Sequence, residues 1–582
     1  MNAKTRTVIL MGAALASAWA FGEEGVRWPL VTMRQMESTT FDKPTLEAMY
    51  AIHARHPGAV DEFWLADCEA KLRDVMTARA RQIGGYAEAS AKVGIIQGYQ
   101  QGVTLGHDFS KRDETSWALP DDAWQIDRNG NRTGFPCPRS PAVQEMEETY
   151  AETYVREGKI ESFWLDDDLR LGFCKRGVES CWCPRCLKAL NERAKTSFTR
   201  EEAVKRLNSS EPEDPLRRIW AETRAETLAE FARAAARGAR RANPRVRMAY
   251  QAISSATINS GEDNAAILEA LSDGWKHPVG IRPGHGYYNE DSDVKREIAA
   301  KVLDVAREAE RCRRYPNWCG SIVYEQENYP HHVMQKTMDA IVREGAIALA
   351  AGCDAVALYW YCSNYPEPLS YYEELVADAA LWKPYYRYLS DLAVRTHLGG
   401  VSKARDPNLM TGLNAAMPRM EGLVRRDPAE VSLALMGVPV TIHEAGSTNH
   451  FASAWVPRGH YLDKVRTELL DRLDRGEPGG VCVRVDKSHP LLVYPRVDAQ
   501  GRTVAVTFVN VSIGTARALP VRVRRPAGKS AAWVRPLEPK AALAPAVGEG
   551  DELRLTLPDL GPWEIATLDL SPALGIAMRG QM

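Results

Sequence analysis

Short apolar segments alternate with amphipathic stretches from about residue 30 to 390, and this alternation limits the folds open to the chain. Segments with the length and apolar character of buried strands are 30–33, 62–65, 93–97, 162–166, 247–251, 280–282, 321–324 and 355–359. Segments with apolar residues at helical spacing include 142–156, 219–237, 294–311 and 335–351. Strands that alternate with helices predict a parallel sheet with helices outside it. A strand count of about eight predicts a closed (β/α)₈ TIM barrel.

The pattern changes after residue 395 and predicts two further domains. Segment 433–442 has strand character and segment 460–475 has a helical charge pattern, so residues 396–490 are expected to form a small α/β domain. Short strands without a long helical period then predict a C-terminal β-sandwich over 491–582. These strands are 491–494, 503–510, 517–523, 553–557 and 563–568. A chain of 582 residues is long enough for these domains and a barrel over 21–395.

The first twenty residues have the parts of a secretory signal peptide. Lys4 and Arg6 carry positive charge, 8–16 is apolar, and 18–20 (Ala-Trp-Ala) is a small-x-small cleavage site. We therefore expect residues 1–20 to be removed and the protein to be periplasmic or secreted, with an uncleaved anchor as the alternative. The apolar stretch is too short to span a bilayer, and no later segment approaches about 20 uninterrupted apolar residues. A formal net charge of −2 provides no overall field for binding nucleic acid.

Four of the eleven cysteines are placed to bind one metal ion. Cys181, Cys183 and Cys186 have the spacing Cys-x-Cys-x-x-Cys, from which three thiolates can reach one tetrahedral ion. Cys137 is the leading candidate for the fourth ligand, although Cys174 is nearer in sequence. Disulfides are the alternative in an exported chain, but Cys-x-Cys spacing is unfavourable for a bridge. We expect a closed, structural zinc site without an open position for substrate, and no organic cofactor.

The fourth predicted strand ends in Asp166, Asp167 and Asp168. Adjacent carboxylates repel one another, so at least one is expected to have a raised pKa unless a cation lies between them. A carboxylic acid that keeps its proton near neutral pH is what protonation of a glycosidic oxygen requires. The alternatives are a helix N-cap, a turn paired with Arg170, and a calcium site.

A second acidic strand end carries Glu325 and Glu327, in the segment Tyr-Glu-Gln-Glu-Asn. Strand ends meet at one face of such a barrel, so these glutamates are expected near the three aspartates. A retaining glycosidase holds its two carboxyl groups about 5–5.5 Å apart, and an inverting one about 6.5–9.5 Å apart. In a retaining enzyme one of these two glutamates, Glu325 or Glu327, would be the nucleophile and the other would bind substrate; a solvated acidic loop is the alternative.

Other residues that follow predicted strands are expected at the same face. They offer hydrogen-bonding groups for sugar hydroxyls or a ring for stacking, and a purely structural role is the alternative for each of them. These residues are Gln100, His107, Arg282, His285 and Trp360.

Together these motifs resemble the family 42 glycoside hydrolases, retaining β-galactosidases built on a (β/α)₈ barrel. Segment 137–141 (Cys-Pro-Arg-Ser-Pro) is similar to that family's Cys-Pro-Asn-Ser-Pro, which supplies one zinc cysteine. Segment 164–168 (Trp-Leu-Asp-Asp-Asp) resembles the end of that family's fourth strand, where an Asn binds sugar and the Glu that follows it is the general acid. Segment 181–186 resembles the site of the other three zinc ligands. The order of domains is also similar.

The resemblance implies Asp168 as acid and base, Asp167 as sugar ligand and Glu325 as nucleophile; Asp167 as the acid is the alternative. It also implies a homo-oligomer, because the middle domain of that family mediates trimers, although this domain is shorter here. Aspartates replace both the Asn and the Glu of the family, and the spacing from the aspartates to the cysteines is longer. Galactose specificity therefore does not carry over.

We therefore expect an exported glycoside hydrolase that cleaves an oligosaccharide or glycoside by a retaining two-carboxylate mechanism. One alternative is a non-catalytic carbohydrate-binding protein on a degenerate barrel. Another is an enzyme of a different class on the same barrel, such as a metal-dependent hydrolase, and a zinc site closed by four cysteines argues against it.

Overall fold

The computed structural model covers the chain between residues 28 and 571 with internal gaps. The segments that it does not describe within these limits are 68–72, 103, 106–116, 167–168, 172–180, 210–213, 253–262, 285–293, 314, 316–317, 319, 327–335, 363–364, 404–427, 442–449, 452–465, 468–469, 472–480, 488, 529 and 539–540. The predicted signal peptide therefore lies outside the described residues.

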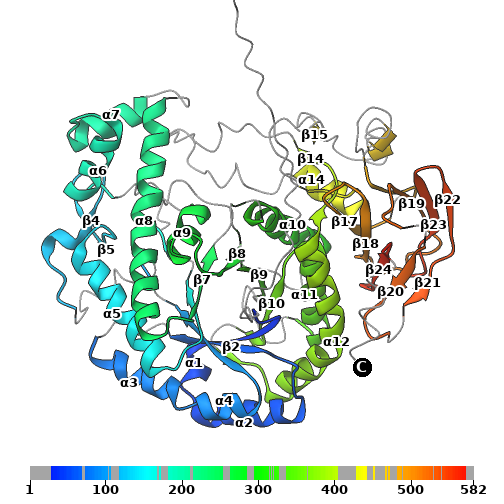
Figure 1. The fold of residues 1–582 in the computed structure, drawn as a ribbon, viewed down its shortest axis with the longest axis horizontal. Helices are drawn as coiled ribbons and strands as arrows, with labels where there is room; N and C mark the ends of the chain where they lie inside the picture. The colour runs from blue at the N-terminus through cyan, green and yellow to red at the C-terminus, as the bar shows by residue number, and fades with distance from the viewer. Residues whose placement is uncertain are drawn as a thin grey trace, which may run out of the picture.

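Eight parallel strands close into a barrel in the order β1-β10-β9-β8-β7-β6-β3-β2 (Figure 1). They are β1 (Val31–Gln35), β2 (Glu62–Asp67), β3 (Ile96–Gln101), β6 (Ser162–Leu165), β7 (Arg247–Ala252), β8 (Val279–Pro283), β9 (Gly320–Glu325) and β10 (Ala355–Leu358). Each overlaps one of the predicted segments, so the prediction of a (β/α)₈ barrel is confirmed. One shift matters: β3 starts at Ile96 rather than at 93, which places Gln100 inside the strand.

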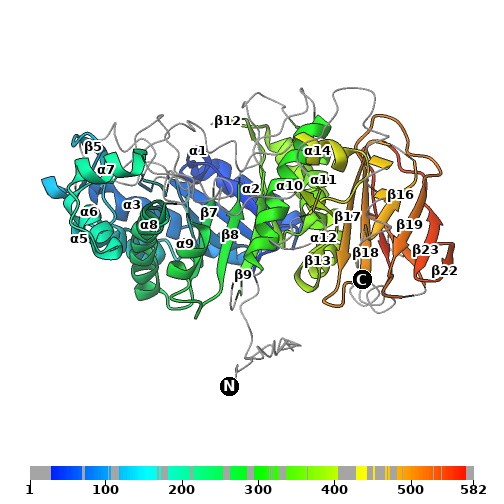
Figure 2. The same ribbon diagram turned by 90° about the horizontal axis from the view of Figure 1, so that it is seen from above.

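Helices surround the barrel, as the helical spacing predicts (Figures 1 and 2). They are α1 (Glu37–Thr40), α2 (Lys43–Arg55), α3 (Arg73–Gly84), α4 (Ala87–Lys92), α5 (Pro141–Glu157), α6 (Pro184–Ala194), α7 (Arg200–Ser209), α8 (Pro215–Ala242), α9 (Asn264–Leu271), α10 (Val294–Cys312), α11 (Met338–Ala351) and α12 (Leu369–Arg395). Three of them, α5, α6 and α8, begin at a proline, whose fixed φ suits the first helical position. Within the described part of the chain, every helix is too short or too polar to cross a membrane.

Side chains alternate along each barrel strand between the barrel axis and the surrounding helices. Trp64 and Trp164 point inward and pack in a tilted arrangement with ring centroids 4.2 Å apart, in a cluster separate from the main core. Trp28 packs against Trp164 at 6.3 Å, ahead of the first strand. A Cβ at Gly280 would come within 2.9 Å of the Trp28 ring, so glycine leaves the space for this ring. Aromatic rings therefore fill the barrel interior below its carboxyl end.

Two antiparallel sheets follow the barrel, in agreement with the strand-rich C-terminal region predicted from the sequence. One sheet has the order β13-β17-β18-β24-β20-β21 and the other the order β16-β19-β23-β22. The first contains β13 (His397–Leu398), β17 (Leu491–Val497), β18 (Thr503–Asn510), β24 (Ile565–Asp569), β20 (Ala532–Val534) and β21 (Ala542–Leu543). The second contains β16 (Val483–Val485), β19 (Pro520–Arg524), β23 (Glu552–Thr556) and β22 (Ala546–Glu549). The exact domain boundaries remain predictions.

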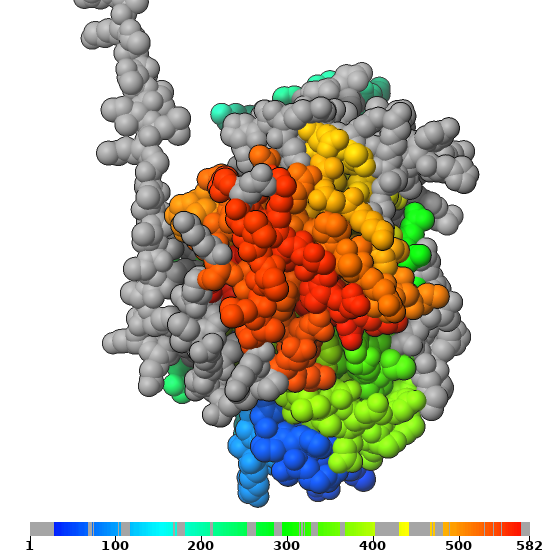
Figure 3. All heavy atoms as spheres, turned by 90° about the vertical axis from the view of Figure 1, so that its right-hand side faces the viewer, coloured from blue at the N-terminus to red at the C-terminus, as the bar shows by residue number. Residues whose placement is uncertain are grey.

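The six-stranded sheet is buried on both faces. Val493 and Phe508 point toward the second sheet and share a core with it. Leu492 and Val509, the alternate residues, belong to the same core as the barrel and its helices. The C-terminal sheets thus cover the side of the barrel formed by α11 and α12 (Figure 3).

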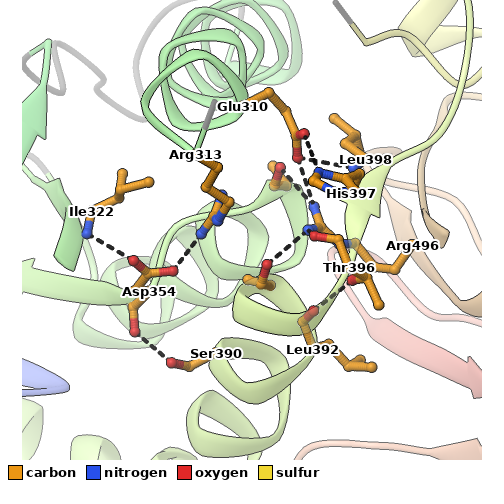
Figure 4. A network of polar contacts seen from close by, with 12 residues as sticks. Glu310, Arg313, Ile322, Asp354, Ser390, Leu392, Thr396, His397, Leu398 and Arg496 are labelled. Atoms are coloured by element: carbon orange, nitrogen blue, oxygen red, sulfur yellow. Dashed lines mark hydrogen bonds and ion pairs between the residues drawn. The ribbon is translucent and has the colours of Figure 1, made fainter. Parts of the chain in front are cut away.

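Arg496 of β17 links the two parts through buried polar contacts (Figure 4). Its guanidinium donates to Thr396 Oγ1 at 3.0 Å and to the Ala393 carbonyl at 3.1 Å, at the end of α12. It also lies 3.5 Å from Glu310 of α10. Only 1% of Arg496 is exposed, so these contacts compensate a charge that is removed from water.

The strand predicted over 433–442 is wrong. The structure has α14 (Pro428–Leu435) here, followed by single bridges from Met436 and Val440. Glu430 on this helix forms a buried ion pair with Arg307 of α10. The predicted segment begins at 433, within the last turn of α14. It leaves out the earlier residues of this helix, so the helical spacing of the apolar residues is not apparent within it. Most of the helix predicted over 460–475 lies outside the described residues.

Candidate functional site

Six polar side chains point inward at the carboxyl ends of the barrel strands. The alternation that directs Trp64 and Trp164 inward also directs inward any residue two positions after an inward-facing one. Asp166 follows Trp164 in this way, and each of the other five side chains has the corresponding position on its own strand. The six side chains are Arg34, Gln100, Asp166, Gln251, Arg282 and Glu325. This end of a (β/α)₈ barrel is where such proteins bind substrates.

Glu325 lies at the centre of this group, as the last residue of β9, and 1% of it is exposed. Arg34 Nε lies 2.8 Å from Glu325 Oε1, and Arg282 Nε lies 2.8 Å from Glu325 Oε2. The next residue is held as well, because Gln326 N donates to the Ala357 carbonyl of β10 at 3.0 Å. Glu325 is thus a carboxylate fixed between two guanidinium groups, one on the adjacent strand β8 and one on β1, beyond β10.

A chain of hydrogen bonds joins Glu325 to the acidic end of β6. Arg282 Nη2 donates to Gln251 Oε1 at 3.1 Å, and Gln100 Nε2 donates to the same oxygen at 3.1 Å. Gln100 Nε2 also lies 3.2 Å from Asp166 Oδ1. The two acidic strand ends picked out by the sequence therefore belong to one polar network across the barrel.

Alternate residues on the same strands point outward and hold the strand ends on the helices. Tyr324, next to Glu325, donates through its hydroxyl to Glu344 of α11 at 2.6 Å. Lys336 Nζ lies 2.6 Å from the other oxygen of Glu344, and neither side chain is exposed. Asp67 at the end of β2 also points outward, where the hydroxyl of Tyr154 donates to it at 2.6 Å. Asp67 is therefore an acidic residue at a strand end that faces the surrounding helices and holds the strand against them.

Four of the predicted catalytic and substrate-binding residues can be located. Gln100, Arg282 and Glu325 come together in the network just described. Trp360 is fully buried after β10, with its ring 4.8 Å from that of Tyr372 on α12. The remaining predicted residues lie outside the described part of the chain: Asp167, Asp168, Glu327, His107 and His285.

Arg34 and Gln251 contact the predicted residues but were not among the site residues predicted from the sequence. Gln251 ends a predicted strand and satisfies the rule that selected Arg282. Arg34 directly follows the first predicted strand, 30–33, whereas β1 extends to Gln35; arginine is seldom buried, so the sequence alone does not indicate that the strand continues through it. A search for polar residues at the last position of each predicted strand or directly after it would have found both.

Cys137, Cys181, Cys183 and Cys186 form a buried cluster in which all four Sγ atoms lie within 4.8 Å of one another. Cys137 Sγ is 3.5 Å from Cys183 Sγ and 3.7 Å from Cys186 Sγ. These distances exceed the roughly 2.05 Å of a disulfide. Four sulfurs about 2.3 Å from a tetrahedral zinc ion would lie about 3.8 Å apart. The donor set therefore fits a metal ion, and it includes Cys137; Cys174 lies outside the described residues.

Local structure favours a thiolate at Cys183, whereas hydrogen bonds from the neighbouring cysteines, and burial, raise the pKa of Cys137 and Cys186. Cys183 is the N-cap of α6, where the helix dipole favours negative charge. Hydrogen bonds from Cys137, Cys181 and Cys186 lower the pKa of Cys183 well below its usual range. Cys137 precedes α5 and the other three cysteines precede or begin α6. The cluster therefore joins the chain segments that lead into and out of β6, the strand that Asp166 directly follows.

Comparison with known proteins supports the fold. No protein-family model matches this chain, and no curated protein does. Among solved structures, the chain is similar to α-L-fucosidase isoenzyme 2 from Paenibacillus thiaminolyticus, with TM-score 0.55, 9% identity, and coverage of 94% of this chain and 100% of that one. It is also similar to the β-galactosidase of the psychrophilic Marinomonas ef1, with TM-score 0.53, 12% identity, and coverage of 93% and 100%.

The β-galactosidase from Bacillus circulans sp. alkalophilus gives a TM-score of 0.53 at 11% identity, over 93% of this chain and 99% of that one. At these identities the likenesses establish a shared fold over nearly the whole chain. The architecture implied by the resemblance to β-galactosidases is therefore confirmed.

Proposed function

We propose that this protein is a glycoside hydrolase that retains the anomeric configuration, with Glu325 as nucleophile and Asp168 as general acid and base. One observation carries the proposal. Glu325 is a buried carboxylate at the carboxyl end of a barrel strand, held between Arg34 and Arg282 and linked through Gln251 and Gln100 to the end of β6.

In the first step Glu325 attacks the anomeric carbon while Asp168 donates its proton to the leaving oxygen. The bond from carbon to that oxygen breaks, and an ester bond to Glu325 forms. In the second step Asp168 takes a proton from water, whose oxygen attacks the anomeric carbon and releases Glu325. Arg34 and Arg282 hold the Glu325 carboxylate in place. They compensate its negative charge before it attacks and again after the ester bond is hydrolysed.

The substrate is an oligosaccharide or glycoside. The fold is shared with proteins described as β-galactosidases and as an α-L-fucosidase, so galactosides and fucosides are the first substrates to test. We further propose that the four-cysteine cluster binds one structural zinc ion, and that the chain is exported after cleavage of residues 1–20.

Alanine substitution tests the nucleophile. In Glu325→Ala we expect kcat on aryl glycosides to fall by at least about 10³-fold. Added azide should restore turnover and give a glycosyl azide of inverted configuration, because it fills the space left by the carboxylate. Glu327→Ala is the matched control and should keep kcat within about tenfold. Recovery of wild-type kcat in Glu325→Ala, or azide rescue in Glu327→Ala instead, would overturn the assignment.

Leaving groups test the acid. Asp168→Ala should cleave aryl glycosides with acidic phenols much faster than alkyl glycosides, since a good leaving group needs no proton. Asp167→Ala should slow both kinds of substrate alike. If the wild-type protein binds glycosides but turns over none of them, the protein is instead a carbohydrate-binding protein on the same barrel.

A further inference from the structure

A crevice of about 590 Å³ lies between the barrel and the C-terminal sheets, apart from the network around Glu325. The first turns of α10 and α11 line one side, and residues 490, 511–513 and 562–563 line the other. Because α10 and α11 follow β8 and β9, their first turns lie toward the carboxyl ends of the strands. The crevice therefore lies toward the same end of the barrel as Glu325. Its volume is within the roughly 300–1,000 Å³ of small-molecule sites, which often lie at domain interfaces.

The sheet side of the crevice is fixed by the buried side chain of Asn510, at the end of β18. Its amide nitrogen lies within 2.9 Å of the carbonyls of Gly514, Leu560 and Gly561. Its amide oxygen accepts from Ser512 N at 3.1 Å and contacts His489 Nε2 at 3.0 Å. One buried side chain thus joins the three loops of this side, so their shape exists before any ligand binds.

Trp563 occupies one of these loops in a backbone conformation that is unfavourable for it. Its φ is +58°, a region in which bulky residues are rare. Trp563 N donates to the Asn510 carbonyl at 2.8 Å, and the Trp563 carbonyl accepts from Arg343 Nη1 of α11 at 2.9 Å. The ring is partly exposed at the crevice. Asparagine or glycine would fit this backbone more easily, so the conformation points to a use for the ring.

Three charged side chains at the crevice, Asp339, Arg343 and Glu344, are paired within the protein, and the lining also includes the exposed Lys295. Arg343 Nε lies 2.7 Å from Asp339 Oδ2, and these side chains are 24% and 59% exposed. Glu344, deeper in, is paired with Lys336. Paired charges give little attraction for an anion or a cation, yet the exposed pair offers both donors and acceptors. A ligand with many hydroxyl groups and an apolar ring face suits this combination of groups.

We propose that this crevice is a second carbohydrate-binding site, which takes a neutral oligosaccharide with a sugar ring against Trp563 and hydroxyl groups on the Asp339–Arg343 pair. The ligand class rests on the proposed function, whereas the site is independent of the catalytic residues. A long substrate bound here would remain close to the barrel opening while its end is cleaved.

Native electrophoresis through gels that contain a soluble polysaccharide tests the proposal. The probes are neutral β-galactan, neutral galactomannan and sulfated galactan, and the full chain carries Glu325→Gln to prevent cleavage. We expect retardation by at least one neutral polysaccharide. Trp563→Ala should weaken that binding on the order of tenfold, and Asp339→Ala should weaken it as well. Trp563→Phe should restore part of it.

Leu543→Ser is the control, because Leu543 is 84% exposed on β21 and lies outside the crevice. It should bind like the parent protein. The proposal is overturned if no neutral polysaccharide retards the protein, if retardation persists in both Trp563→Ala and Asp339→Ala, or if sulfated galactan alone binds. Retardation that depends on Trp563 in a protein without glycosidase activity would leave this site intact and contradict the proposed function alone.

Discussion

Two buried charges lie directly behind Glu325, on the helix side of β9. Lys336 and Glu344 are each fully buried and 2.6 Å apart, and Tyr324 donates to the same carboxylate. Removing one partner leaves the other charge buried without compensation, which costs about 3–5 kcal/mol. We expect Lys336→Met to lose about this much free energy of unfolding in urea. The double variant Lys336→Met with Glu344→Gln should lose clearly less, and equal losses would show that the two charges are not coupled.

A single histidine should make stability depend on pH. His53 on α2 is buried against Tyr372, with Nε2 2.6 Å from its hydroxyl. Burial, and to a lesser extent the charge of His56, lowers the pKa of His53 from 6.5 to about 3. Below pH 6.5 the unfolded chain therefore takes up a proton that the folded chain does not. Stability should fall as pH drops from 6.5 toward 3, by about 2 kcal/mol at pH 5.

His53→Gln removes this titration, so its free energy of unfolding should change less between pH 7 and pH 5 than that of the wild-type protein. Urea unfolding at several pH values measures the difference. Parallel profiles for the two proteins would show that His53 does not titrate as its burial implies.

Secondary structure elements differ in how far the sequence predicts them. The barrel strands were predictable because each overlaps a short apolar segment that lies between amphipathic helices. The strands at 532–534, 542–543 and 546–549 were missed because they are short and their apolar residues do not stand out from the turns around them. The inward-facing network could be predicted in part: the rule of polar strand ends finds Glu325 and Arg282. It does not tell which end residue faces inward, since that depends on the register of each strand.

The contact between β17 and the barrel depends on Arg496. Although burial alone would raise the pKa of Glu310, its hydrogen bond with His397 and the charges of Arg496 and Arg313 hold it at about 2. In Arg496→Met the pKa of Glu310 should rise, and the free energy of unfolding at pH 7 should fall by about 3–5 kcal/mol. The wild-type protein should lose part of its stability as the pH falls from 4.5 to 2. In this range Glu310 takes up a proton in the unfolded chain, whereas in the folded protein it is still a carboxylate. The variant should lose less in that range.

Arg496→Lys is the control for charge, because lysine keeps the cation but not the several donors that reach Thr396 and Ala393. The free energy of unfolding of Arg496→Lys should lie between those of Arg496→Met and the wild-type protein. An acid-unfolding profile that is the same in Arg496→Met and the wild-type protein would contradict this account of Glu310.

For the whole molecule, the four-cysteine cluster should govern thermal stability and not the chemical step. Cys183→Ser should lose bound zinc, measured by mass spectrometry of the metal, and should be destabilised by on the order of 4 kcal/mol or more. Cys353→Ser is the control, because Cys353 is buried but lies outside the cluster. It should retain one zinc ion per chain. A fully active, equally stable Cys183→Ser would contradict a structural role for the cluster.

The six-stranded sheet described above has one face in the barrel's own core, and this has a consequence for the order of folding. During synthesis the barrel strands are complete once β10 has been made, but the outer faces of α11 and α12 lack their cover until β24 has been made. Apolar surface therefore remains exposed through the synthesis of the whole C-terminal region, which invites aggregation. A chain that stops after α12 should be insoluble even though it contains every strand of the barrel. β24, the last strand that the structure describes, thus completes the domain that begins to fold first.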